Sequence, residues 1–497
     1  MFQALKSKLS SRASLLAGNV VDTILPLVRS IVLAHLLVKE EFGLAIMIAA
    51  ASGMTETMAD FGLQYSAVRA RGAISSDRYY ATLHSVLLIR AAILGAIVLA
   101  AAPLLVWMLD QWHVLWAFMA LGVVVFLRGF GNLSIYEHMR DYVYWPVALA
   151  FSSSQLAWTI VAIAAAWYFG DYSCMVYGLF GSLITYLILS HVLAPRRWRL
   201  GWDKDAGREI VEYGRPLIPN GIANAFATQG DRFVVGSALG TAVLAVWNVT
   251  MATSVLPRGM IIRVLIGTFM PVFVNRGITA AKDTRLFDRW AACLSIIVTC
   301  YVLGLLAFGR PLIGLVYGAD YQPTPLLMNL VAIVACIKFF ACIPVPPALA
   351  FGHTKLVLWN SVSSALSLAI AATSIPWLRS LEDFVMILAV TDFIALSWIL
   401  LRSVAMYGFT RATLYAIVLI PLVTFCTLAA LNHLVPTLSL VAWVALCCVA
   451  GLAILGSILA ILARSGLPPR KLIHPGQVAV AAPEAKKDAC TGHRHDG

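Results

Sequence analysis

The chain has 497 residues, of which 61% are hydrophobic and only 12% are charged, and its formal net charge is +12. Soluble domains carry roughly 25% charged residues, so this composition excludes an ordinary soluble protein. Apolar runs of roughly 20 residues recur along almost the whole chain, as a hydrocarbon core about 30 Å thick requires. Because lipid offers no partner for backbone polar groups, these runs must form helices. The sequence therefore predicts an all-α polytopic membrane protein.

Hydropathy places about fourteen transmembrane helices along the chain. A short basic N-terminus precedes the first span, and we find no small-residue cleavage site after it, so we expect this helix to be retained. The predicted spans cover residues 14–38, 42–68, 81–106, 112–132, 144–168, 172–194, 214–236, 241–270, 288–309, 325–350, 355–378, 383–404, 411–432 and 438–463.

The chain divides near its middle at its longest polar connection. Its halves resemble each other after a shift of about 202 residues, as internal repeats of transporters do. We therefore expect two pseudo-symmetric six-helix lobes and a C-terminal helix pair. The expected parts are a cytoplasmic N-terminus at 1–13, an N-lobe at 14–194, a cytoplasmic linker at 195–213, a C-lobe at 214–404, the helix pair at 411–463 and a disordered cytoplasmic tail at 464–497.

Lysine and arginine residues alternate between the predicted loops. Most of the 36 fall on the side of the N-terminus, and only Lys39, Arg310 and Arg379 fall on the other side. The positive-inside rule therefore predicts that both termini lie in the cytoplasm. Cytoplasmic loops that face anionic lipid explain the net charge, so no nucleic-acid partner is expected.

Polar residues form stripes on the first helix of each half. Under the repeat, Arg29 of the first span aligns with Asp231 of the seventh, and Asp22 aligns with Asn224. Steps of three and four residues keep side chains on one helix face. Because polar groups facing lipid are costly, we expect the stripes to face the bundle interior or a watery cavity. The alternative, that they only join helices through hydrogen bonds, stays open at this point.

The ionisable residues within the predicted spans are the candidate site. The cations expected to bind the substrate are Arg29, Arg90, Arg232, Arg258, Arg263 and Lys338. The polar groups expected to line the same cavity or to carry a coupling ion are Asp22, Glu56, Asp60, Asn224, Asp231 and Asp392. Excess positive charge suits an anionic cargo, above all a diphosphate, which arginine binds with paired donors. Arg90 and Arg232 also have a structural interpretation, since both could reach the interface or pair locally.

Two of these cations lie beside prolines. Arg258 follows Pro257 at mid-span, and Lys338 precedes the Pro-rich run at 343–347. Such interruptions mark a moving element or a binding region in transporters. We expect Arg258 to contact the diphosphate, and Arg29 and Asp231 to face one cavity from opposite lobes.

The nine cysteines are scattered and lack the spacing of a metal site or a disulfide framework. We expect them to act as small buried hydrophobic residues. The sequence therefore predicts no metal and no cofactor, with Na⁺ or H⁺ coupling left open.

Several short segments carry a resemblance to a known family. They are LLVKEEFGL at 36–44, ADFGL at 59–63, YGRPLIP at 213–219, GDRFVVG at 230–236, FMPVF at 269–273 and PLIGLVYG at 311–318. In their order and spacing they resemble the O-antigen type (Wzx-like) polysaccharide flippases of the multidrug/oligosaccharidyl-lipid/polysaccharide (MOP) exporter superfamily. His35 departs from that pattern, because relatives often have arginine at this position.

The resemblance implies two lobes that form a V around a cationic cavity. It implies a transporter, not an enzyme, which moves an undecaprenyl-diphosphate-linked oligosaccharide from the cytoplasmic to the periplasmic leaflet of a bacterial inner membrane by alternating access. Such proteins serve lipopolysaccharide or exopolysaccharide biosynthesis, with membrane lipids and other polysaccharide-assembly proteins as partners. The alternatives are a cation-coupled multidrug exporter of the same superfamily, a peptidoglycan-precursor flippase, and a membrane glycan polymerase or ligase. Short external connections without a catalytic constellation disfavour the last.

Overall fold

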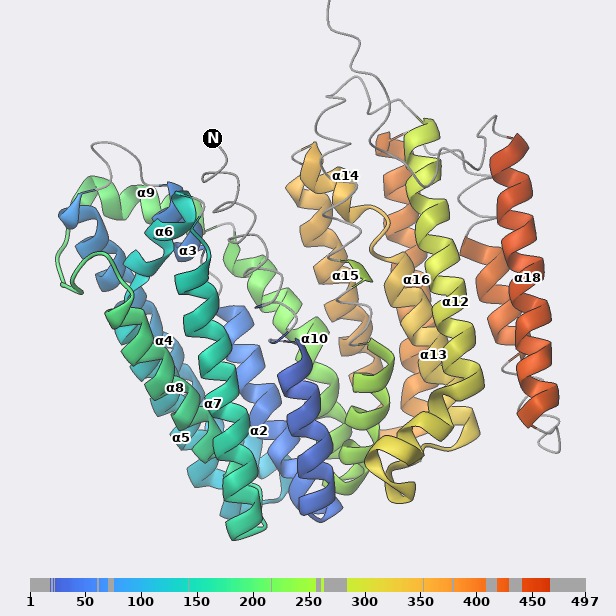
Figure 1. The fold of residues 1–497 in the computed structure, drawn as a ribbon, viewed down its shortest axis with the longest axis horizontal. Coiled ribbons are helices and arrows are strands. Elements are labelled where there is room, and N and C mark those ends of the chain that lie inside the picture. The colour runs from blue at the N-terminus through green and yellow to red at the C-terminus, as the bar shows by residue number, and fades with distance from the viewer. Residues whose placement is uncertain are drawn as a thin grey trace, which may run out of the picture.

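The computed structural model describes residues 18, 21, 23–59, 62–69, 76–141, 143–215, 217–255, 261–262, 284–351, 353–377, 380–407, 418–428 and 440–464. Within these residues every regular element is a helix. The two halves of the chain form two bundles that stand side by side, and α18 (Leu440–Arg464) lies at the outer edge of the second bundle (Figure 1). The predicted fold class, an all-α polytopic protein of two lobes with outer C-terminal helices, is confirmed.

The N-lobe is built from a bundle of long helices together with the short helices α3 and α6. They are the helix Thr23–Leu36, α2 (Lys39–Met58), α3 (Leu63–Arg69), α4 (Asp77–Leu109), α5 (Leu115–Leu127), α6 (Glu137–Arg140), α7 (Trp145–Phe169) and α8 (Ser173–Val192). The second predicted span is a bent pair, because α2 and α3 meet at an angle of 41°. Ser76 begins α4 by accepting a hydrogen bond from the backbone N–H of Tyr79. Gly170 ends α7 in the left-handed conformation, with φ of 70°.

The C-lobe repeats this architecture with one broken helix. Its elements are α10 (Leu217–Leu239), the helix Thr241–Val255, α12 (Thr284–Tyr317), α13 (Pro325–Phe340), α14 (Val345–Ala350), α15 (Thr354–Thr373) and α16 (Leu381–Tyr407), followed by the helix Val418–Leu428 and by α18. The break between α13 and α14 has a chemical cause. Pro344, Pro346 and Pro347 have no N–H to donate to the carbonyls four residues earlier. For one of these carbonyls, that of Ile343, the buried Trp290 Nε1 is the donor instead, at 2.7 Å.

Eight helices in the described part of the chain are long and apolar enough to cross a membrane, and the bent pair α2–α3 makes a ninth candidate. The described residues also hold three shorter apolar helices, Thr23–Leu36, Thr241–Val255 and Val418–Leu428, and a shorter apolar stretch, Ala445–Gly456, within α18. A helix lies within every predicted span. The number of fourteen membrane crossings stays a prediction.

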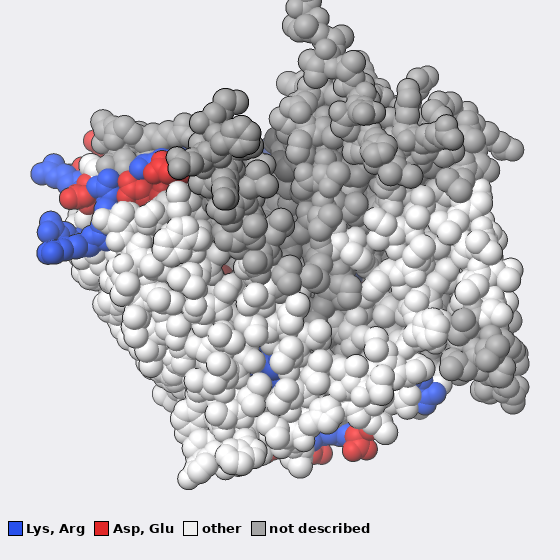
Figure 2. All heavy atoms as spheres, viewed as in Figure 1, with Lys and Arg blue, Asp and Glu red and all other residues white. Residues whose placement is uncertain are grey.

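On the face shown in Figure 2, most of the visible charged side chains lie at the two ends of the molecule and few lie between them. One end, which we call the α9 end, carries α9 (Lys204–Gly214), α6 and the start of α4 (Figure 1). The other end carries Lys39 and Arg310 and is called the opposite end. This distribution fits a multi-pass membrane protein, since charge is costly within the hydrocarbon layer.

The connection between the lobes is structured. Residues 195–203 lie against the N-lobe, where the carbonyl of Arg196 accepts from Asn132 Nδ2 at 2.8 Å and the N–H of Gly201 donates to Ser85 Oγ at 3.1 Å. The following helix, α9, packs Ile210 into an apolar cluster made of N-lobe residues. The stretch predicted as a polar linker therefore belongs structurally to the N-lobe.

The lobes meet along α2, which runs antiparallel to α10 and also touches the helix that follows α10. An added Cβ at Gly43 of α2 would overlap the backbone of Thr241, the first residue of that following helix, and one at Gly221 of α10 would lie 3.0 Å from the carbonyl oxygen of Thr57. Small residues permit this approach, as in other membrane helix pairs. We call this contact the α2–α10 seam. At the opposite end the lobes also share an apolar core, where Phe42 meets the Tyr321 ring edge-on at 5.7 Å.

Candidate functional site

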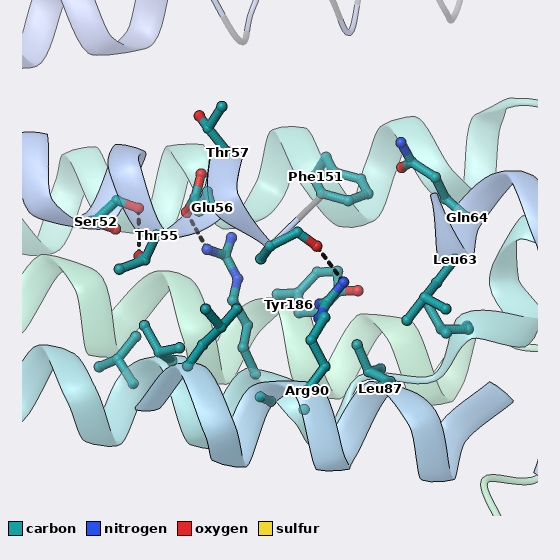
Figure 3. Close-up of a pocket in the computed structure, with 18 of the residues that line it drawn as sticks. Ser52, Thr55, Glu56, Thr57, Leu63, Gln64, Leu87, Arg90, Phe151 and Tyr186 are labelled. Carbon is teal, nitrogen blue, oxygen red and sulfur yellow. Dashed lines mark hydrogen bonds and ion pairs between the residues drawn. The ribbon is translucent and has the colours of Figure 1, made fainter. Parts of the chain in front are cut away.

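A cavity of about 430 Å³ opens inside the N-lobe, towards the α9 end. It lies between α2, α4, α5 and α8, and Figure 3 shows its polar wall, formed by Ser52, Thr55, Glu56 and Gln64, opposite Arg90 and Tyr186. We call it the N-lobe cavity. Its apolar wall includes Leu87 and Phe151. A hollow of this size, in which polar and charged groups face an apolar wall, is typical of a ligand site.

The charged side chains of this cavity form an ion pair and hydrogen bonds with groups of the N-lobe itself. Glu56 of α2 forms an ion pair with Arg128, which follows α5. The Arg90 guanidinium donates to the carbonyl of Ala59, at the end of α2 (Figure 3). Both contacts tie α4 and α5 to α2, the helix of the N-lobe that touches the C-lobe. An anion entering this cavity would therefore compete with Glu56 for Arg128.

A second, smaller hollow of about 150 Å³ lies between the lobes, and we call it the interlobe pocket. Its lining residues come from the first helix, α2 and α8 on one side and from α10 and the next helix on the other. They are Pro26, Arg29, Ser30, Leu33, Phe42, Ile46, Ala49, Ala50, Met175, Gln229, Arg232 and Asn248. Ile46, Ala49 and Ala50 lie one turn before the α2 residues of the N-lobe cavity, so the two hollows follow one another along α2.

Arg29 brings a buried cation to the interlobe pocket from the N-lobe. The residue is only 7% exposed, and its guanidinium lies over the Trp158 ring, 3.9 Å from the centroid. Its Nη1 has no hydrogen-bond partner within the described residues. A buried donor left in this way is costly unless a ligand or water satisfies it.

Arg232 brings the second cation, from α10 of the C-lobe. Its Nε donates to Asn248 Oδ1 at 3.0 Å, and its Nη1 donates to Gln229 Oε1 and, at 3.3 Å, to the carbonyl of Thr228. These partners orient the side chain but are all uncharged. Across the described ranges, neither Arg29 nor Arg232 forms an ion pair, so the pocket collects positive charge from both lobes.

Asp231 does not share this pocket, contrary to the prediction that it faces the cavity of Arg29. Its Oδ2 accepts a hydrogen bond from the buried Trp247 Nε1 at 2.8 Å. One residue further along α10, Arg232 turns by about 100° around the helix and reaches the pocket. The repeat alignment found the right turn of α10 but not the right side chain.

Lys338 is not an unpaired cavity cation either. Its Nζ lies 3.2 Å from Asp392 Oδ2, and the aspartate is 5% exposed. The pair joins α13 to α16 inside the C-lobe. Neither residue lines the N-lobe cavity or the interlobe pocket.

The remaining predicted residues fall into two groups. Asn224 is exposed on α10, where its carbonyl accepts from Thr228 Oγ1 at 2.7 Å. Asp22, Asp60, Arg258 and Arg263 lie outside the described residues. In the part of the chain that the structure describes, no three His, Cys, Asp or Glu side chains are grouped as a metal site requires, and the eight described cysteines are free thiols.

Sequence reasoning missed Arg128. Hydropathy placed it near the end of the fourth predicted span and assigned it to a cytoplasmic loop. In the structure it follows α5 and turns into the N-lobe cavity. Glu56, an acid within an apolar span, was a signal that a cation had to face it, but sequence spacing alone does not name the partner.

Known proteins resemble this chain in sequence and in fold. A family model described as "Polysaccharide biosynthesis protein" matches residues 32–325, more than half of the chain. The amylovoran biosynthesis protein AmsL of Erwinia amylovora is 19% identical over 208 residues, which are 41% of this chain and 54% of that protein. The chain thus spans about half the length of this curated relative.

Two solved transporters share the fold. A lipid II flippase, MurJ, in an inward closed conformation, aligns with a TM-score of 0.68 and 15% identity, over 90% of this chain and 98% of that one. A multidrug resistance MATE family transporter of the MOP superfamily, in an inward-facing conformation, gives a TM-score of 0.60 and 15% identity, over 78% and 96%. At such identities the likeness shows the fold alone, and it does not separate a lipid cargo from a drug.

Proposed function

Because the chain belongs to the polysaccharide biosynthesis protein family, we propose that it is a flippase that moves a diphosphate-linked oligosaccharide lipid across a bacterial inner membrane. The cargo enters from the cytoplasmic leaflet and leaves in the periplasmic leaflet. The α9 end is then the cytoplasmic one, as the excess of positive charge in its predicted loops favours. The protein carries its cargo and changes no covalent bond.

The interlobe pocket is the observation that carries this proposal. Arg29 and Arg232 come from different lobes, and their described partners are an aromatic ring and neutral oxygens. A diphosphate supplies charge and several acceptor oxygens, so it satisfies both guanidiniums with charge-assisted hydrogen bonds. A ligand held by both lobes at once also favours their closure around it.

The N-lobe cavity fits the approach to this pocket. It lies nearer the α9 end along the same helix, α2, and holds Arg90 and Arg128. A diphosphate that reaches Arg128 displaces Glu56, whose carboxylate then lacks its partner. The deeper pocket offers two arginines without such a competitor in the described residues. An anion that moves inward from the α9 end therefore passes from an arginine that is paired with a carboxylate to two arginines that are not paired with one.

Transbilayer movement in liposomes tests the proposal. The purified protein is reconstituted with an undecaprenyl-diphosphate oligosaccharide, and an added impermeant glycosidase digests the sugars that reach the outer leaflet. We expect rapid digestion beyond the half that is accessible at the start. Loss of one charge-assisted hydrogen bond costs about 1.5–3 kcal/mol, so Arg29→Ala and Arg232→Ala should slow the movement by roughly 10- to 100-fold.

Arg208→Ala is the matched control, because Arg208 lies on α9 with an 80% exposed side chain. Arg232→Lys keeps the charge but loses the paired donors, so its rate should fall between those of the wild type and Arg232→Ala. Unchanged rates in both alanine variants would remove the interlobe pocket from the mechanism. Movement of a lipophilic cation, with none of the oligosaccharide lipid, would favour the multidrug exporter instead.

A further inference from the structure

A buried ion pair in the middle of the C-lobe is separate from both hollows. Lys338 lies near the end of α13 and Asp392 near the centre of α16, and 3.2 Å separates Nζ from Oδ2. The lysine side chain is 20% exposed and that of the aspartate 5%. Lys338 lies midway along the candidate membrane span Pro325–Ala350, which joins α13 and α14, and Asp392 lies midway along the candidate span Leu381–Val404.

Such a pair is seldom retained for stability alone. Taking two charges out of water costs several kcal/mol for each ion, and an apolar pair of similar size is often as stable. Ionisable groups at mid-membrane accordingly mark ion or proton sites more often than packing. The pair therefore calls for an explanation beyond holding α13 against α16.

The surroundings of the aspartate are those of a small cation site. Ser367 Oγ of α15 lies 2.6 Å from Asp392 Oδ1 and 2.8 Å from Thr391 Oγ1. Carboxylate and hydroxyl oxygens from two helices thus lie within hydrogen-bond distance of one another beside the ammonium of Lys338, and oxygen is the ligand that hard cations prefer. Just beyond Lys338 the helix is interrupted between α13 and α14, and interrupted helices contribute to the coupling-cation sites of many transporters.

Lys338 also lies in the last turn of α13. The N–H of Ala341 donates to Ile337, and the α13 end is followed by a turn before α14 begins at Val345. Carbonyls at the C-terminal end of a helix carry partial negative charge, which favours a cation there. The ammonium of Lys338 lies in this field on a flexible stem.

We propose that Lys338 is a tethered cation that fills a monovalent-cation site formed by Asp392, Ser367 and Thr391. The ammonium is a compact, strongly hydrated charge, comparable in its role here to a bound Na⁺. With the lysine in place, the site takes up no free metal ion. Removal of the ammonium turns it into a site that binds Na⁺ reversibly. Only the consequence, that cargo movement needs no Na⁺ at this site, rests on the proposed function.

Thermal unfolding of the purified full chain in detergent tests this inference without any transport. The melting temperature, Tm, is compared in about 100 mM choline, K⁺ and Na⁺ chloride at equal ionic strength, because a ligand that binds the folded state raises Tm with its concentration. Wild type should show no Na⁺-specific shift. Lys338→Ala should melt lower in choline and regain about 3 °C or more in Na⁺.

The controls separate this site from general salt effects. Lys355→Ala removes an exposed lysine from α15 of the same lobe and should respond to Na⁺ as the wild type does. Lys338→Ala combined with Asp392→Asn removes the carboxylate and should lose the Na⁺ response. Lys338→Ser adds an oxygen ligand and should gain at least as much from Na⁺ as Lys338→Ala.

A Na⁺-specific rise of Tm in the wild type overturns the inference, because the site would then bind metal beside the lysine. The absence of any Na⁺ response in both folded Lys338 variants also overturns it. If neither variant can be purified in choline, recovery in Na⁺ supports the inference, and failure in every salt contradicts it. These Tm values do not depend on transport. A negative result in the flippase assay would therefore contradict the proposed function without contradicting the inference about Lys338.

Discussion

Substitution of Gly43 by alanine probes the α2–α10 seam. Gly43 lies in the first turns of α2, where α2 passes Thr241. An ideal Cβ at this position would lie 2.6 Å from the carbonyl carbon and 2.9 Å from the Cβ of Thr241. Nothing flexible can yield on that side, because the nearest atoms belong to backbone.

The size of the effect follows from these distances. Carbon atoms in contact prefer a separation of about 3.5–4.0 Å, so the alanine requires the helices to move apart by about 1 Å. Overpacking of this kind costs about 1–3 kcal/mol. If this free energy destabilises only the conformation in which the lobes touch at the opposite end, the ratio of molecules open at that end to molecules closed there rises by about 5- to 150-fold.

Thiol labelling measures that ratio. In a cysteine-free background, Leu244→Cys places a thiol at a fully buried position. Leu244 packs against α10, since its Cδ2 lies 3.2 Å from where a Cβ of Gly236 would be. An impermeant maleimide should label it faster when Gly43→Ala is added. Gly304→Ala is the control, since a Cβ there meets nothing within 4 Å. Equal labelling rates in Gly43→Ala and Gly304→Ala would refute the reasoning.

Two further predictions concern stability. Trp290→Phe removes the donor that satisfies the buried carbonyl of Ile343, so unfolding should cost about 1–3 kcal/mol less, seen as a lower Tm in detergent. Burial acts to raise the pKa of Glu137, but hydrogen bonds and charge from Arg196 and Arg140 outweigh it and lower this pKa. The lowered pKa stabilises the fold above the unfolded value of about 4.3 and ceases to do so as the pH falls through the folded pKa, so Glu137→Gln should flatten the acid end of a Tm–pH curve.

Each of these has a matched control. Trp377 is 76% exposed, so Trp377→Phe should leave Tm unchanged, and an equal loss in both variants would contradict the role given to Trp290. Asp141 has a 70% exposed side chain, so Asp141→Asn should keep the steep acid slope. A wild-type curve without any loss of stability in acid would contradict the account of Glu137.

The sequence predicted the fold class and the positions of the helices because hydropathy reports lipid exposure directly. It also singled out Arg29 and Arg232, which both line the interlobe pocket, since a charged residue inside an apolar run is visible without a structure. α9 was missed within a polar connection, although Asp203 followed by Ala206 and Ile210 has the spacing of a capped amphipathic helix.

The partner of each charged side chain within the membrane helices could not be predicted in the same way. The ion pair of Lys338 with Asp392 and that of Glu56 with Arg128 join helices far apart in the chain. Their existence depends on how helices rotate about their axes when they pack, and hydropathy does not report this. For the same reason the repeat alignment selected Asp231, whereas the neighbouring Arg232 reaches the pocket.

The attachment of residues 195–203 and α9 to the N-lobe has a consequence for dividing the protein into two chains. A cut within 195–203 separates this segment from Asn132 and Ser85, and Ile210 from its apolar cluster. A cut between Gly214 and Leu217 spares these contacts. Two co-expressed fragments, one ending at Gly214 and the other beginning at Leu217, should therefore reassemble more efficiently than a pair divided at the middle of the polar connection.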